Sequence, residues 1–294
     1  MSRNHPNHHL SLLKYLLAIF LVFVLVAVVW CAFSKISSTK PAHTSKTSQS
    51  SSAIIPKTKE SSSASASVSA GVAYAPSQEE VAYLKQRFAD LSAVNPEVVG
   101  YIYAPGTMLD EPVVQTSDNS HYLDYTFDGS YQPFMGTVFM DKDNRKDFSD
   151  SLTWLFGHAR GSQVADHRMF NDVNFYDKQS YFDQHPYVVL ETPSRKYYYE
   201  AMFFIVVPET TAFYRTSFDS KEQFAEQLNE VAKDAISKKA DAKADANDHY
   251  LVLSTCREED TTIRANLYLR RIPDDEMNAF VKEHASQLTY QATR

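Results

Sequence analysis

The sequence predicts a mainly-β domain of about eight strands with a few interposed helices, and an inventory of that size favours a barrel. Two observations carry this prediction. Short apolar or alternating runs recur between turn residues such as Ala104-Pro105-Gly106 and Thr192-Pro193-Ser194, which is a pattern typical of strands. The 18 Tyr and 18 Phe among the 294 residues can fill a substantial aromatic core, and no internal repeat suggests a solenoid instead.

The first landmark along the chain is residues 15–33, which carry no charge. An apolar stretch of that length can cross a bilayer core of about 30 Å as a helix. A cleaved signal peptide is the alternative, but its apolar region is usually about 7 to 15 residues long. The length favours a retained transmembrane anchor, in which Cys31 would be a membrane-embedded cysteine.

The anchor divides the chain into segments of different character. Basic residues lie on both sides of it, so the positive-inside rule does not decide its orientation. All segments with the sequence pattern of a folded domain follow the anchor. We therefore expect residues 1–14 to form a short cytoplasmic N-terminus. Residues 34–76 are dominated by Ser, Thr, Ala and Lys. They offer few apolar side chains to offset chain entropy, which predicts a flexible tether.

Charge and cysteine content exclude two classes of protein. The net charge is −7 and no basic patch stands out, which argues against a nucleic-acid partner because phosphate binding needs a basic surface. Cys31 and Cys256 are the only cysteines. The chain is therefore not built on a disulfide framework.

Helices are predicted where apolar side chains recur at helical spacing. The first covers residues 77–95, where Ser77 has the signature of an N-cap. An amphipathic surface helix is expected over residues 220–239, and a terminal helix over residues 274–288, with Pro273 at its boundary. Shorter helical turns are expected around Ser117-Asp118-Asn119 and at residues 170–175 and 178–185.

The predicted strands share a short apolar or alternating run bounded by turn residues. They are residues 98–103, 112–115, 137–140, 152–156, 187–191 and 197–207, followed by the two arms of a hairpin within residues 250–271.

That hairpin carries the first candidate for chemistry. Its sequence, YLVLSTCREEDTTIRANLYLRR, places Cys256 at the mouth of the turn and Arg264 at the start of the returning strand. A thiol and a guanidinium could thus lie side by side at one edge of a sheet. A free cysteine is often a small buried hydrophobe, and it can equally be a nucleophile. The residues of the hairpin alone leave both interpretations open.

A catalytic thiol needs a proton partner, and histidine serves that role near neutral pH. Among the ten histidines, His158 stands out because it follows Gly157 at the end of the apolar run LTWLF, a strand-end position like that of Cys256. A guanidinium cannot act as the base, but Arg264 can donate hydrogen bonds to a developing oxyanion. Arg257, next to the thiol, is the alternative arginine.

In combination, these features closely resemble the sortases, the cysteine transpeptidases of Gram-positive cell surfaces. The resemblance covers roughly residues 78–272 and is that of class B, because of the N-terminal helix and the helix at 220–239. The segments that carry it are GYIYAPGT, EPVVQTSDNSHYLDYTFDG, GTVFMD, FSDSLTWLFGH, YVVLETPSRKYYYE and LSTC with an arginine eight positions after the cysteine.

The resemblance implies a fold and a site. The fold is an eight-stranded β-barrel with an N-terminal helix and a further helix before the cysteine strand, in a catalytic domain at 77–273 with a C-terminal helical extension at 274–294. Cys256 is implied as nucleophile, His158 as acid/base and Arg264 as the stabiliser of substrate and tetrahedral intermediate. The implied substrate-binding residues, which line a groove for the sorting motif, are Asn119, Leu123 and Thr255.

The implied reaction is attack of Cys256 on a Thr carbonyl in a C-terminal sorting motif, followed by transfer of the acyl group to an amine. The partners would be surface proteins or pilins as donors, with a cell-wall peptide or a pilin lysine as acceptor. The enzyme would be a single-pass membrane protein with an extracellular catalytic domain, and this chemistry requires no metal or cofactor. Two alternatives stay open: a cysteine peptidase that transfers the acyl group to water, and a non-catalytic surface protein with a structural thiol.

The sequence also departs from the family pattern at three places. Phe156 stands where a Tyr often precedes Gly-His, Arg257 follows the cysteine where small or polar residues are usual, and NLYLRR replaces a Val-rich ending. These departures bear on substrate choice more than on mechanism.

Overall fold

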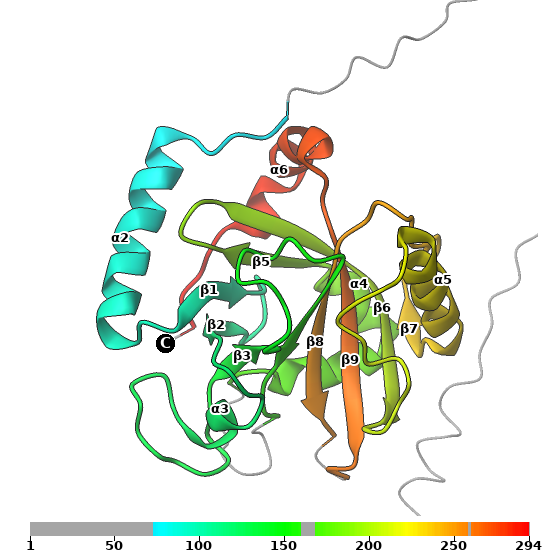
Figure 1. The fold of residues 1–294 in the computed structure, drawn as a ribbon. Coiled ribbons are helices and arrows are strands. Elements are labelled where there is room, and N and C mark those ends of the chain that lie inside the picture. The colour runs from blue at the N-terminus through cyan, green and yellow to red at the C-terminus, as the bar shows by residue number, and fades with distance from the viewer. Residues whose placement is uncertain (1–72, 160–167, 258–259, 294) are drawn as a thin grey trace, which may run out of the picture. The chain divides into compact units, whose positions relative to one another are not determined.

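The computed structural model describes residues 73–159, 168–257 and 260–293 (Figure 1). The predicted anchor at 15–33 and most of the predicted tether lie outside these residues. Within the described part of the chain, no helix is both long and apolar enough to cross a membrane. The elements in chain order are α2 (Gln78–Val94), β1 (Val98–Tyr103), β2 (Asp110–Val114), α3 (His121–Asp124), β3 (Val138–Met140), β4 (Leu152–Phe156), η1 (Asn171–Asp177), α4 (Gln179–Gln184), β5 (Tyr187–Glu191), β6 (Lys196–Pro208), α5 (Lys221–Val231), η2 (Ala232–Asp234), β7 (Ser237–Lys238), β8 (Tyr250–Cys256), β9 (Ile263–Arg271) and α6 (Asp274–Leu288).

The strands form a closed barrel. Their order is β5-β1-β2-β3-β4-β8-β9-β6, and β5 pairs with the first part of β6 to close the ring, while β7 pairs with a later part of the same edge of β6, opposite β9. The pairs β2–β3 and β4–β8 are parallel. The prediction of a mainly-β, eight-stranded barrel with flanking helices is confirmed.

Alternation along the strands separates an interior core from two outer layers. The interior is apolar and includes Val113, Leu155, Leu253 and Leu267, all fully buried. On the outer face of β1 and β5, a second cluster packs beneath α2 and α6; on the outer face of β4, β8, β9 and β6, a third packs beneath α5 (Figure 1). The strands of the barrel are thus packed on their inner face by the interior core and on their outer face by helices.

The helix predicted at 220–239 is too long. It begins as expected with Ser220 as N-cap, but α5 ends at Val231 and a short 3-10 turn follows. Ser237 instead pairs with Phe204 in β6, and its hydroxyl donates to the carbonyl of Tyr176. Pairing with the exposed edge of β6 overrides the helical spacing because it satisfies backbone groups that a surface helix end would leave to water.

A buried carboxylate attaches α2 to the barrel. Glu191, at the end of β5, is fully buried and its carboxylate oxygens lie 2.9 Å from Arg87 Nε of α2 and 2.8 Å from Lys196 Nζ of β6. Arg87 also lies over the ring of Tyr101, with 3.8 Å between Cζ and the ring centroid. The two cations neutralise a carboxylate that would be costly to bury alone.

We expect Glu191→Ala to lower the free energy of unfolding by about 3–5 kcal/mol, because it leaves two partly buried cations without their carboxylate. Urea denaturation followed by circular dichroism measures this loss. Glu230→Ala is the matched control, since its pair with Lys233 is exposed and should cost less than about 1 kcal/mol. Equal losses in the two variants would contradict the attachment role.

Candidate active site

The hairpin places a thiol opposite a guanidinium, as its sequence predicts. Strands β8 and β9 are antiparallel and Cys256 is the cross-strand partner of Arg264. Residues directly opposite each other in such a pair project to the same face of the sheet. Cys256 is a free, partly exposed cysteine, so its sulfur is accessible to a reactant.

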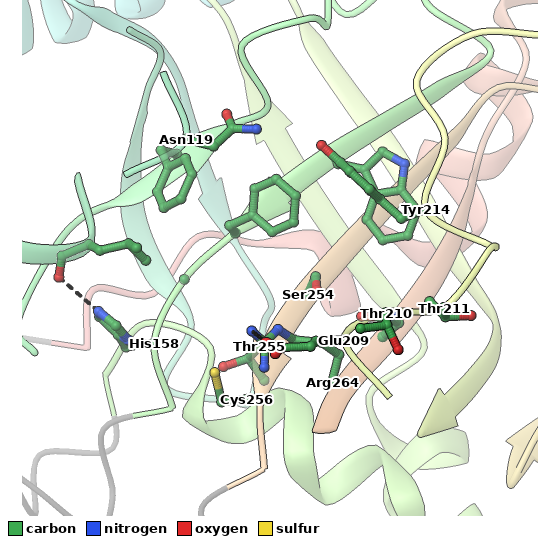
Figure 2. Close-up of a pocket in the computed structure, with 16 residues that line it drawn as sticks. Asn119, His158, Glu209, Thr210, Thr211, Tyr214, Ser254, Thr255, Cys256 and Arg264 are labelled. Carbon is green, nitrogen blue, oxygen red and sulfur yellow. Dashed lines mark hydrogen bonds and ion pairs between the residues drawn. The ribbon is translucent and has the colours of Figure 1, made fainter. Parts of the chain in front are cut away.

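Strand β4 brings His158 to the same edge. It pairs in parallel with β8, with Phe156 opposite Ser254, and the amide of Gly157 donates to the carbonyl of Ser254 at 3.3 Å. His158 therefore leaves β4 where Cys256 ends β8. Figure 2 shows His158, Cys256 and Arg264 around a cavity of about 410 Å³ that all three line.

The orientation of the His158 ring is set by a backbone carbonyl. Nε2 of His158 lies 2.8 Å from the carbonyl oxygen of Leu123, the contact drawn as a dashed line in Figure 2. Because a carbonyl only accepts, Nε2 carries the hydrogen. In the neutral imidazole, Nδ1 is then the nitrogen that can take up a proton.

Gly136 allows this contact to form. Its φ is +57°, and a Cβ at this position would lie 2.6 Å from the carbonyl oxygen of Tyr122 and 2.9 Å from that of Leu123. The same Cβ would lie 3.1 Å from Cδ2 of His158. Only glycine combines this backbone angle with so close an approach, so Gly136 fixes the spacing between the α3 segment and the histidine.

The guanidinium of Arg264 is held from one side. Its Nη2 lies 2.6 Å from Oε2 of Glu209, and its Nη1 donates to the carbonyl of Thr261 at 2.6 Å. Glu209 is itself tied to the hairpin, since its amide donates to the carbonyl of Thr262 at 2.8 Å. A guanidinium has five N–H donors, so the two contacts orient Arg264 without using all of its hydrogen-bonding capacity.

The opposite wall of the cavity is built on Asp141, which is fully buried. Its Oδ2 accepts hydrogen bonds from Nδ2 of Asn119, at 2.8 Å, and from the hydroxyl of Tyr214. Oδ1 of Asn119 accepts from the amide of Lys142 at 2.9 Å, which fixes the orientation of the side-chain amide. Burial, together with the hydrogen bond to Asp141, raises the pKa of Tyr214 and keeps its hydroxyl as a donor.

Comparison with known proteins agrees with this geometry. The chain is 27% identical over 176 residues to sortase B of Staphylococcus aureus, which covers 60% of this chain and 70% of the relative. It is 28% identical over 178 residues to sortase B of Listeria monocytogenes, with 60% and 69% covered. No family model matches the sequence.

Among solved structures, a Staphylococcus aureus sortase B–substrate complex superposes with a TM-score of 0.59 at 26% identity, covering 67% of this chain and 93% of the other. In sequence and in fold the chain is similar to class B sortases. The resemblance read from the sequence is thus confirmed by both comparisons.

The three groove residues implied by the resemblance all border the cavity. Asn119 and Leu123 both line it, and the backbone carbonyl of Leu123 is the hydrogen-bond partner of His158. Thr255 borders the cavity too, but it is the cross-strand partner of Ala265, which belongs to the interior core. Alternation therefore directs the Thr255 side chain into the barrel, where its hydroxyl is buried.

Arg257 does not line the cavity. Its Nη2 lies 3.3 Å from Oδ2 of Asp177 in η1, and neighbouring Asn174 donates to the carbonyl of Cys256 at 3.2 Å. Arg257 thus ties the end of β8 to η1. A direct part in substrate selection, suggested by its unusual identity in the family pattern, has no support in this placement.

Sequence reasoning missed the segment after β6. Glu209, Thr210, Thr211 and Tyr214 all line the cavity, yet their sequence matches no catalytic or binding motif. The available signal was the polar and aromatic run ETTAFY directly after a long predicted strand. Ser254 and Asn266 were missed as well. Alternation along the cysteine strand already puts Ser254 on the face of Cys256, whereas only the pairing of β8 with β9 shows that Asn266 shares that face.

We expect Gly136→Ala to lower kcat/KM for a peptide substrate by about 100-fold, since displacing a catalytic group by about 1 Å can cost that much. The Cβ would push the Leu123 carbonyl away from His158. The measurement is steady-state cleavage of a fluorogenic sorting peptide.

Gly129→Ala is the matched control for that experiment. Gly129 also has a positive φ, +81°, but a Cβ there meets no atom within 4 Å. It reproduces the backbone strain without the collision, so its activity should stay close to that of the natural chain. Equal loss in both variants would show that strain, rather than the histidine contact, is responsible.

Proposed function

We propose that this chain is a membrane-anchored cysteine transpeptidase that cleaves a sorting motif and transfers the acyl group to an amine. The observation that carries the proposal is the meeting of Cys256, His158 and Arg264 on one cavity, from three strand ends. A structural thiol would be expected inside the core. Cys256 instead ends its strand, is partly exposed, and lines the same cavity as His158 and Arg264.

In the first half-reaction, Cys256 gives its proton to Nδ1 of His158, and the resulting thiolate attacks the scissile carbonyl carbon so that an S–C bond forms. The carbonyl electron pair moves to oxygen, where the guanidinium of Arg264 stabilises the oxyanion. Collapse of the intermediate breaks the C–N bond, and the departing nitrogen takes a proton from His158. The product is a thioester on Cys256 and a free amine.

In the second half-reaction, an acceptor amine attacks the thioester carbon. His158 takes the proton that the amine loses, the C–S bond breaks, and the sulfur leaves as a thiolate. His158 then returns its proton to the sulfur, which restores the starting protonation state, and one amide bond has been exchanged for another. The same steps with water in place of the amine describe a cysteine peptidase.

The substrate would lie along Asn119 and Leu123 beside Thr255. Asn119 is suited to recognise a peptide because Asp141 and the amide of Lys142 fix its side-chain amide in one orientation. The donors would be surface proteins or pilins, and the acceptor a cell-wall peptide or a pilin lysine. The proposed anchor at 15–33 and tether at 34–76 would hold the domain at the outer face of the membrane.

Incubating the chain with a sorting-motif peptide library and an amine such as triglycine tests the reaction. We expect an amide product and a thioester on Cys256 that mass spectrometry detects, both absent in Cys256→Ala. Acid product alone, independent of the amine concentration, would establish the peptidase instead. If no peptide forms a thioester, the alternative that Cys256 is a structural thiol would stand instead.

Arg264→Lys should lower kcat/KM by about 100-fold or more, because an ammonium does not reproduce the fork of donors at the oxyanion. The control is Arg270→Lys on the same strand, whose guanidinium pairs with Asp248 away from the cavity. That variant should retain nearly full activity. Thermal melting of both variants checks folding, and near-normal turnover in Arg264→Lys would refute the role of the guanidinium.

A further inference from the structure

The 3-10 helix η1 contacts the backbone of both the proposed nucleophile and the proposed base. The amide of Phe170, which is the N-cap of η1, donates to the carbonyl of His158 at 3.1 Å. Four residues later, Nδ2 of Asn174 donates to the carbonyl of Cys256 at 3.2 Å. The strand ends that carry the imidazole and the thiol are therefore joined through η1 as well as through the pairing of β4 with β8.

The spacing of its apolar side chains fixes η1 on the end of the barrel. Phe170, Val173 and Tyr176 recur every third residue, which is the period of a 3-10 helix, and all three belong to the interior core. Asp172, itself buried, accepts a hydrogen bond from the amide of Met108 at 2.8 Å. Because the barrel core holds η1 in place, η1 gives the two strand ends a fixed point of attachment.

The carbonyl of Cys256 lies where strand pairing has stopped. The carbonyl of Ser254 accepts from the amide of Gly157, on the side of β4. Carbonyls two residues apart in a strand point the same way, so that of Cys256 also points to this side, but the ladder between β4 and β8 ends at Ser254. Asn174 thus supplies from its side chain the hydrogen bond that β4 no longer provides.

The orientation of the Asn174 amide is set by a second contact. Asn174 and Asp177 are three residues apart on η1, so they share a face, and both contact Arg257. Nη1 of Arg257 lies 3.4 Å from Oδ1 of Asn174, and its Nη2 lies 3.3 Å from Oδ2 of Asp177. A guanidinium only donates and a carbonyl only accepts. One orientation of the amide therefore serves both contacts, with Oδ1 toward Arg257 and Nδ2 toward Cys256.

We propose that Asn174 is a positioning residue, whose side-chain amide holds the backbone of Cys256 at a fixed place relative to His158 and so sets the separation of thiol and imidazole. This inference rests on the transpeptidase function proposed above. Asn174 does not line the cavity, so it acts through Cys256 and not on the substrate. Proton transfer and attack on the carbonyl both depend on that separation. Loss of the contact therefore slows the chemical step and leaves peptide binding intact.

Asn174→Asp tests the hydrogen bond with almost no change of shape. The carboxylate keeps the contact with Arg257 but has no hydrogen to donate to the carbonyl of Cys256. In single-turnover kinetics with a sorting-motif peptide, we expect the maximal rate constant of thioester formation to fall by about tenfold or more. The half-saturating peptide concentration should stay within about twofold of that of the natural chain.

Asn174→Ala removes the same donor without adding a charge, and it should show the same loss. A loss in Asn174→Asp alone would point to charge repulsion and overturn the proposal. An unchanged rate constant in both variants, or a change confined to the half-saturating concentration, would also overturn it.

Asn229→Asp is the matched control. Asn229 of α5 likewise donates through Nδ2 to a backbone carbonyl, that of Ala244 at 3.0 Å, and accepts through Oδ1 from the amide of Ala244 at 2.9 Å. It does not line the cavity. The control should keep the natural rate constant even where thermal melting shows a loss of stability like that of Asn174→Asp. Equal losses of rate in the two variants would show that stability, and not positioning, is responsible.

Alkylation of Cys256 by iodoacetamide gives a second readout that needs no peptide. Only the thiolate reacts, and the amount of thiolate depends on proton transfer to His158. Mass spectrometry of the fragment that contains Cys256 follows the reaction as a function of pH. The profile of Asn174→Ala should move toward that of His158→Ala, whereas the profile of Asn229→Asp should match that of the natural chain.

The outcomes separate this proposal from the function on which it rests. If no peptide forms a thioester on Cys256, the transpeptidase proposal fails, and the alkylation profile still decides the role of Asn174. If thioesters form and the Asn174 variants react at the natural rate, only the role of Asn174 fails. A profile of Asn174→Ala that coincides with that of the natural chain would contradict the role as well.

Discussion

The parallel pairing of β4 with β8 is the constraint on which the site depends. In a parallel pair the carboxyl ends of both strands meet at one edge, and the register that puts Phe156 opposite Ser254 leaves His158 beside Cys256. A slip of one residue would direct Cys256 into the apolar interior, because side chains alternate between faces. The antiparallel β8–β9 pair adds Arg264 from the other side.

The barrel wall serves both stability and chemistry. Its inner face is mostly apolar, whereas its outer face at β4, β8 and β9 is covered by α5 at one end and open to a cavity at the other. Cys256 and Arg264 thus stand on strands whose other residues are fixed by core packing. Catalytic groups on such rigid elements are held in place before a substrate arrives.

Two buried carboxylates show how environment sets the role of a residue type. Glu191 lies between the cations Arg87 and Lys196 and joins α2 to the barrel. Asp141 accepts hydrogen bonds from Asn119 and Tyr214, which both line the cavity. The first carboxylate stabilises the fold, and the second holds together two walls of the cavity that come from distant parts of the chain.

The sequence by itself determined the strands, the first and last helices, the resemblance to class B sortases and the candidates Cys256, His158 and Arg264, because these depend on local pattern and short motifs. Only the tertiary structure decided the end of α5, where pairing with β6 overrides helical spacing. It also decided that Glu209, Tyr214 and Asn266 face the cavity. No local pattern encodes such a placement, since it depends on which strands pair and on where a loop returns.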